Sequence, residues 1–123
     1  MLRTADATAV ATAVATHHRG TPVVVMTGEV DSTTVEPVRH HLFDQLDLRP
    51  PGLVVDLSGV SFIGSTGLHV LTEAATRAEL SGTTLAVVAR HRAVLLPMRL
   101  TRLDREVTVC DTVDQAVTAV SAR

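Results

Sequence analysis

The residues best suited to chemistry lie in one short stretch, Gly64-Ser65-Thr66-Gly67, which follows the apolar pair Phe62 and Ile63. A helix is predicted to begin here, and the first turn of a helix carries unpaired backbone N–H groups at the positive end of its dipole. That field would stabilise a phosphate on Ser65, and the glycines leave the approach to its hydroxyl open. Ser65 is therefore a candidate phosphoacceptor, with Thr66 as the second choice. From the residues alone, a helix cap is the simpler interpretation of such a serine.

Other chemistries use the same region. Asp56 ends a predicted strand and could accept a phosphate in a receiver domain, but such a domain also requires a lysine, which this chain lacks. Ser65 could instead be the nucleophile of a hydrolase with His69, one helical turn further, as its base. That alternative stays open, although the Gly-x-Ser-x-Gly pattern is absent. For Asp31 we favour a cap of the first helix, and for Asp56 an acceptor of N–H groups in the following loop.

Composition excludes several classes of function. The chain has 123 residues, the size of one domain, and its 11 basic residues are all arginine, which excludes a P-loop lysine or a Schiff base. The formal net charge is −2 and there is no basic stretch, so we expect no nucleic-acid partner. Cys110 is the single cysteine, and no Cys-x-x-Cys or His-x-x-x-His spacing occurs, so we expect no disulfide, metal or cofactor. Since no signal peptide or membrane span is predicted, we expect a cytoplasmic protein without membrane contact.

Apolar periodicity predicts alternating strands and helices. Five strands are expected, at Thr8–Thr16, Val23–Val30, Leu53–Leu57, Leu85–Ala89 and Glu106–Cys110. Four helices are expected, from Thr34 to Arg49-Pro50, over Thr66–Leu80, over His91–Leu100, and after a cap at Asp111. The first two strands would form an antiparallel hairpin, and the later alternation predicts a largely parallel sheet.

Some connections and boundaries are also predicted. The residues His17 to Gly20 indicate the hairpin turn, and Ser58–Ser65 indicates a loop in which Phe62 and Ile63 point inward. Pro97 predicts a kink or an early end of the third helix. Residues 1–7 are expected to be a flexible N-terminus and residues 8–123 a single domain.

Two motifs together resemble the STAS family. The first is a Gly-Glu-hydrophobic-Asp turn after an early strand, matched here by Gly28-Glu29-Val30-Asp31. The second is a strand ending Asp-Leu-Ser, an aromatic-hydrophobic pair and a Ser-Ser/Thr-Gly-Leu helix start. It is matched by Asp56-Leu57-Ser58, Phe62-Ile63 and Ser65-Thr66-Gly67-Leu68. The expected order of elements also agrees with that family from Thr8 to Val120.

The resemblance implies an α/β fold with a mixed, mostly parallel sheet and helices packed mainly on one face. It also implies a non-enzymatic anti-sigma factor antagonist. Such a protein binds an anti-sigma factor that is also a serine kinase with a histidine-kinase-like ATPase fold. Phosphorylation of the serine at the position of Ser65 releases the complex, and a serine phosphatase resets it.

Carried onto this chain, the resemblance implies a set of partner-binding residues around the acceptor: Asp31, Gly64, Thr66, Gly67 and His69. Many phosphorylated family members carry aspartate immediately before the serine, where this chain has Gly64. The alternative is therefore a STAS module that is not phosphorylated and acts as a binding module in another signalling complex.

Overall fold

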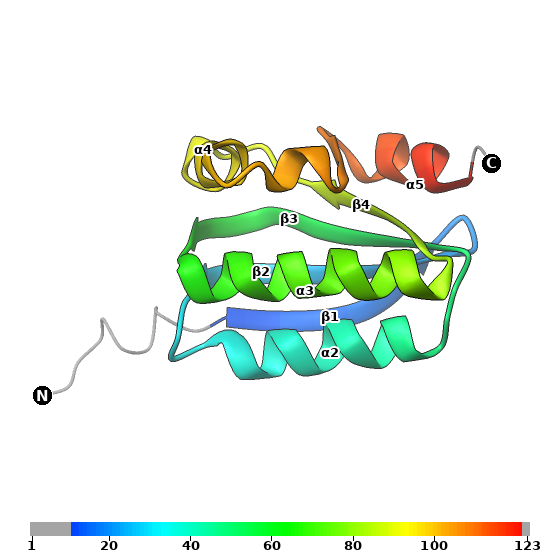
Figure 1. Ribbon diagram of the computed structural model, residues 1–123, viewed down its shortest axis with the longest axis horizontal. Coiled ribbons are helices and arrows are strands. Elements are labelled where there is room, and N and C mark those ends of the chain that lie inside the picture. Colours follow the sequence, from blue (N-terminus) through cyan, green and yellow to red (C-terminus); the bar gives the residue numbers. More distant parts are fainter. Residues whose placement is uncertain (1–10, 122–123) are drawn as a thin grey trace, which may run out of the picture.

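The computed structural model of the chain describes residues 11–121 (Figure 1). Its elements are β1 (Ala11–His18), β2 (Thr21–Val30), α2 (Val35–Asp47), β3 (Gly52–Ile63), α3 (Ser65–Ser81), β4 (Thr84–Val88), α4 (Arg92–Leu100), the 3-10 helix η1 (Leu103–Arg105), β5 (Thr108–Cys110) and α5 (Val113–Ser121). The flexible segment predicted for residues 1–7 lies outside the described residues, and the boundary at residue 8 stays a prediction. No helix of the described part is both long and apolar enough to cross a membrane.

One five-stranded sheet forms the centre of the fold, in the order β1-β2-β3-β4-β5. The β1–β2 pair is antiparallel and the other three pairs are parallel, which confirms the predicted mixed, mostly parallel sheet. The hairpin turn consists of Arg19 and Gly20, whose φ angles of 51° and 83° are both positive, as a type I′ turn requires. The predicted turn was therefore too long, since His17 and His18 belong to β1 and pair with β2.

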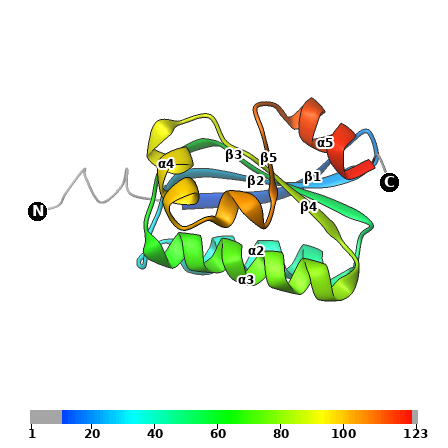
Figure 2. The ribbon, with the colours of Figure 1, turned by 45° about the horizontal axis from the view of Figure 1, so that its top comes forward.

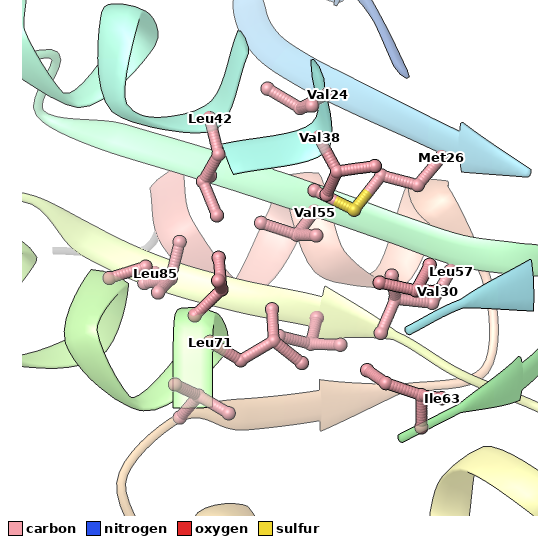
Figure 3. Packing of buried hydrophobic residues seen from close by; sticks show 14 of the residues in the cluster. Val24, Met26, Val30, Val38, Leu42, Val55, Leu57, Ile63, Leu71 and Leu85 are labelled. Carbon is pink, nitrogen blue, oxygen red and sulfur yellow. The ribbon is translucent and has the colours of Figure 1, made fainter. Parts of the chain in front are cut away.

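Helices cover both faces of this sheet. The larger core joins one face to residues of α2, α3 and α4, and Figure 3 shows part of it, including Val24, Val55 and Leu71. The smaller core lies on the opposite face under α5, which Figure 2 shows across the sheet from α2 and α3. Alternation along β3 divides its side chains, with Val54 in the smaller core and Val55 in the larger one. The helices therefore lie mainly on one face, as expected.

The strand β3 is much longer than the Leu53–Leu57 segment that the sequence predicts. It runs from Gly52 to Ile63, and its second half pairs with β2 as far as Val30 and Ile63. The pairing register of β2 and β3 shifts between the pair Val25–Asp56 and the pair Thr27–Gly59. The polar and glycine residues of β3 at this irregularity are of the types that predict a loop in the sequence. The predicted loop at Ser58–Ser65 is therefore wrong, because pairing with β2 keeps this segment in the sheet.

Two helix predictions also need correction. A kink or an early end was predicted at Pro97; α4 continues to Leu100, so the early end is wrong, and the kink stays a prediction. Val94 and Met98, on either side of the proline, are fully buried, and this packing offsets the single hydrogen bond that proline removes. The cap of α5 is Thr112 and not Asp111, because Thr112 Oγ1 accepts the N–H of Gln115 at 3.1 Å.

A polar contact fastens α2 to α3. Arg39 donates two hydrogen bonds to the Glu73 carboxylate, at 2.5 and 2.9 Å. The guanidinium groups of Arg39 and Arg77 lie 4.8 and 4.6 Å from the centre of the Phe43 ring. The hydrogen bonds from Arg39 lower the pKa of Glu73 below its ordinary value of 4.5.

Glu73→Gln is expected to make the stability of the chain less dependent on pH in the acid range. Because the pKa of Glu73 is lower in the folded chain, its stabilising effect is complete above the unfolded value of 4.5 and is lost as pH falls through the folded value. The melting temperature of Glu73→Gln should therefore be lower than that of the unmodified chain at neutral pH, and the two should converge in acid. Glu79→Gln is the control, since Glu79 is exposed on the same helix and forms no ion pair with the described residues. If the melting temperatures of Glu73→Gln and the unmodified chain differ by the same amount at neutral and acid pH, the ion pair of Glu73 with Arg39 does not stabilise the fold as described.

Candidate binding surface at the start of α3

The ends of β2 and β3 bring two predicted site segments together. These strands are parallel neighbours whose last pair is Val30 and Ile63, so the residues that follow them meet at one edge of the sheet. The Gly64 N–H donates a hydrogen bond to the Val30 carbonyl at 2.8 Å. A Cβ placed on Gly64 would lie 3.8 Å from the Cβ of Asp31. Asp31 and Gly64 therefore form one surface with the start of α3, at the left of Figure 1.

Ser65 is the first residue of α3, one residue earlier than predicted. Gly64 precedes it as the cap position, with extended backbone angles of φ −91° and ψ −179° and no side chain to form a capping bond. The interpretation of Ser65 as a helix cap is therefore wrong. Its side chain is exposed, and among residues 11–121 no hydrogen bond partner is found for its hydroxyl. Thr66 is half-buried, so the first-choice acceptor is also the more accessible one.

Gly67 is required by the close approach of α3 to the strand ends. It is buried, and a Cβ there would lie only 2.7 Å from Ile63 Cγ1 and 2.8 Å from Val30 Cγ1. Figure 3 shows Val30 and Ile63 among the side chains of the larger core. The role that the structure gives to Gly67 is packing, which fixes where the exposed residues before it lie.

Asp31 orders the segment between β2 and α2. Its Oδ1 accepts hydrogen bonds from the N–H and the hydroxyl of Thr33, at 2.9 and 2.7 Å. Thr34, the cap position of α2, accepts the Asp31 N–H at 3.0 Å and donates to the Glu29 carbonyl at 2.6 Å. Asp31 therefore closes a turn before the helix and does not cap α2 as predicted. The bonds from Thr33 lower the pKa of Asp31, so a carboxylate stays ionised beside Gly64.

An exposed aromatic ring, which the sequence did not predict, lies next to this turn. Phe62 is 46% exposed, whereas Ile63 is 4% exposed and belongs to the larger core. The Phe62 ring would lie 3.5 Å from a Cβ on Gly64. The prediction that both residues point inward is wrong for Phe62, because successive residues of a strand point to opposite faces. His69 is exposed one turn further along α3, as expected.

The structure bears on the rival chemistries as well. Asp56 is 9% exposed inside β3, and its Oδ1 accepts the N–H and the hydroxyl of Ser58 at 3.0 and 2.7 Å. An acceptor role was predicted, but the N–H belongs to a strand residue and not to a loop, because Asp56 lies within β3 and does not end it. The burial argues against an accessible phosphoacceptor. Among the described residues Ser65 and His69 form no hydrogen bond, so no nucleophile–base pair is present. No group of three His, Cys, Asp or Glu side chains in that part of the chain could hold a metal ion.

Comparison with known proteins adds to this geometry. The family model of the STAS domain matches residues 12–116. The chain belongs to the STAS family. The chain is 34% identical to a STAS relative, the anti-sigma-F factor antagonist RsfB of Mycobacterium tuberculosis, over 104 aligned residues. The aligned residues make up 84% of each of the two chains.

Two solved STAS structures resemble this one. The crystal structure of an anti-sigma factor antagonist from Mycobacterium paratuberculosis has a TM-score of 0.84 and 35% identity, covering 90% of this chain and 94% of that one. A putative anti-sigma factor antagonist from Thermotoga maritima has a TM-score of 0.76 and 25% identity, covering 89% and 94%. The STAS fold inferred from the two sequence motifs is therefore confirmed.

Proposed function

We propose that this STAS protein is an anti-sigma factor antagonist that acts by binding. The relatives from the two Mycobacterium species, at 34% and 35% identity, carry that description. The observation that carries the proposal is the exposed Ser65 hydroxyl at the first residue of α3, directly after Gly64, which the exposed ring of Phe62 approaches. An apolar ring next to a free hydroxyl, with an ionised carboxylate nearby, suits a protein interface better than a catalytic centre.

In this proposal the partner is an anti-sigma factor with a histidine-kinase-like ATPase fold that is also a serine kinase. The unphosphorylated chain binds it and thereby frees the sigma factor. Phosphorylation of Ser65 ends the complex, and a serine phosphatase restores the binding form. The contact surface comprises Asp31, Gly64, Thr66 and His69 around the acceptor, while Gly67 sets the position of the helix beneath them.

The switch follows from the charge of the phosphate. A phosphoserine brings between about −1.5 and −2 charges into a surface that holds an apolar ring and the ionised Asp31. In the free protein, water and the positive end of α3 stabilise that charge, the helix end by about 0.3–1 kcal/mol. In the complex the water is removed, and an unpaired buried charge costs several kcal/mol. Phosphorylation therefore favours the free form.

The antagonist function can be tested without ATP. Immobilised chain is incubated with a lysate of the source cells, and the retained proteins are identified. We expect an anti-sigma factor, and we expect the purified chain to release sigma factor from the purified anti-sigma–sigma complex. Capture of an anti-sigma factor whose sigma factor stays bound at saturating chain would contradict the antagonist function.

Gly64 supports one alternative, a STAS module that binds without being phosphorylated. The extended backbone at Gly64 and its nearest neighbour distance of 3.5 Å leave room for an aspartate. If the anti-sigma factor binds both forms but transfers phosphate only to Gly64→Asp, the natural chain is a constitutive binder. Equal phosphorylation of both forms excludes that alternative.

A further inference from the structure

The helix α4 has a second apolar stripe on the side away from the core. Val94 and Met98 are fully buried, and the residues opposite them at helical spacing are Leu96 and Leu100. Leu96 is 39% exposed and Leu100 is 75% exposed. Ala93, exposed one turn before Leu96, continues the stripe. Figure 2 shows α4 at the outside of the fold, in agreement with the exposure of Leu96 and Leu100.

The segment that contains α4 is rich in arginine. Five of the 11 basic residues lie within residues 90–105, namely Arg90, Arg92, Arg99, Arg102 and Arg105. With one acid, Asp104, this segment has a formal charge of +4. Because the net charge of the chain is −2, the remaining residues together carry −6. At 100° per residue, Arg92 and Arg99 lie beside Leu96 on the outer face. The outer face of α4 is therefore apolar at its centre and cationic at one flank.

These arginines are available to a partner. Among the described residues Arg19, Arg39 and Arg77 are each paired with a carboxylate. In contrast, Arg92 and Arg99 form no ion pair with residues 11–121, and both are exposed. Arginine is enriched in protein interfaces, and the two exposed leucines add apolar surface beside it.

We propose that the outer face of α4, defined by Ala93, Leu96, Leu100, Arg92 and Arg99, docks an acidic amphipathic helix of a partner protein. Aliphatic side chains of that helix lie against the two leucines, and its carboxylates pair with the two guanidinium groups. The contact belongs to the weak, transient size class, since on this chain a single helix of 9 residues provides it. This docking does not involve Ser65 and does not rest on the proposed function.

Two other occupants fit the surface less well. A membrane would receive only two leucines from a nine-residue helix whose other face is in the core, which is too little apolar surface for stable insertion. A second copy that offered the same face of α4 would bring the arginines of both copies together, and like charges repel. A copy that offered its exposed Leu48 and Leu80 instead would bring no free carboxylate from the neighbouring Asp47, which is paired with Arg77. That contact would also be head-to-tail and would not close into a symmetric dimer.

The test uses a fluorescent synthetic peptide of Glu, Ala and Leu, with leucines at helical spacings i, i+3, i+4 and i+7, titrated with the full chain. A matched peptide with Arg in place of Glu is the charge control. We expect the acidic peptide to bind, and to bind about tenfold more weakly to Leu96→Ser/Leu100→Ser and to Arg92→Ser/Arg99→Ser. High salt should weaken binding to the unmodified chain, and the basic peptide should not bind.

Leu48→Ser/Leu80→Ser is the matched variant, since it removes two exposed leucines elsewhere and should bind the acidic peptide like the unmodified chain. Circular dichroism checks folding, and Leu100→Ser alone serves if the double variant unfolds. Absent binding, or equal binding by the α4 variants, overturns the proposal. Two further results would also overturn the proposal if the acidic peptide does not bind. The first is binding to vesicles of anionic phospholipid that the α4 variants lose, and the second is self-association in sedimentation that the α4 variants lose.

Discussion

Ser65→Glu is expected to weaken binding to the proposed anti-sigma factor by about 100-fold, which corresponds to ~2.7 kcal/mol. The added carboxylate would be desolvated beside the half-exposed Phe62 ring and near the ionised Asp31. Ser65→Ala should keep its affinity within about threefold, because the hydroxyl has no hydrogen bond partner in the described part of the chain. Calorimetric titration of the purified anti-sigma factor with each variant measures both values.

Thr76→Glu is the matched charge control for that experiment. Thr76 is exposed on the same helix, near its middle, and lies away from the surface formed by Asp31, Gly64 and Ser65. The Thr76→Glu variant should bind the anti-sigma factor with the affinity of the unmodified chain. If Ser65→Glu and Ser65→Ala bind equally well, charge at Ser65 does not control the complex and the switch is wrong.

Gly67→Ala is expected to lower the free energy of unfolding by about 2 kcal/mol. Alanine would normally stabilise a helix interior relative to glycine by up to about 1 kcal/mol. Here the new Cβ would lie 2.7 Å from Ile63 Cγ1 and 2.8 Å from Val30 Cγ1, both in the packed core. The first turn of α3 must move outward or the strand ends must shift. Urea denaturation measures the loss, and the displaced helix start should also weaken partner binding.

Gly64→Ala provides the control for this steric argument. It makes the same chemical change three residues earlier, where the backbone is extended and the nearest atom is 3.5 Å away. Its loss of stability should be less than about 1 kcal/mol, the scale of a change at a cap position. A Gly67→Ala chain as stable as the unmodified one would show that α3 has room at its start, and that the close packing is misassigned.

The sequence predicted the order of elements well, because the core-forming runs are strong signals. The Val23–Val30 run is β2 with its end residue correct, and Gly82 ends α3 in the left-handed conformation as a glycine cap allows. The two motifs also identified the region of the site. Ser65 and Asp31 do lie at one edge of the sheet, since the strands before them are parallel neighbours.

The sequence failed where tertiary pairing overrides local signals. Ser58 and Gly59 resemble a loop, yet β2 pairs with this segment and extends β3 to Ile63. That extension places Ile63 inward and Phe62 outward, which alternation would have indicated had the strand been recognised. The side-chain bonds of Asp31 to Thr33 and the close contact at Gly67 depend on three-dimensional packing, so no local pattern could have predicted them.

The most direct test of the central claim is a phosphorylation assay with the purified anti-sigma factor, ATP and the chain, followed by mass spectrometry that locates the phosphate. The account predicts one phosphate, on Ser65, which is absent in Ser65→Ala and retained in Thr66→Ala. Phosphate on Thr66 or at another site, or an unmodified chain in a stable complex with active kinase, would contradict it.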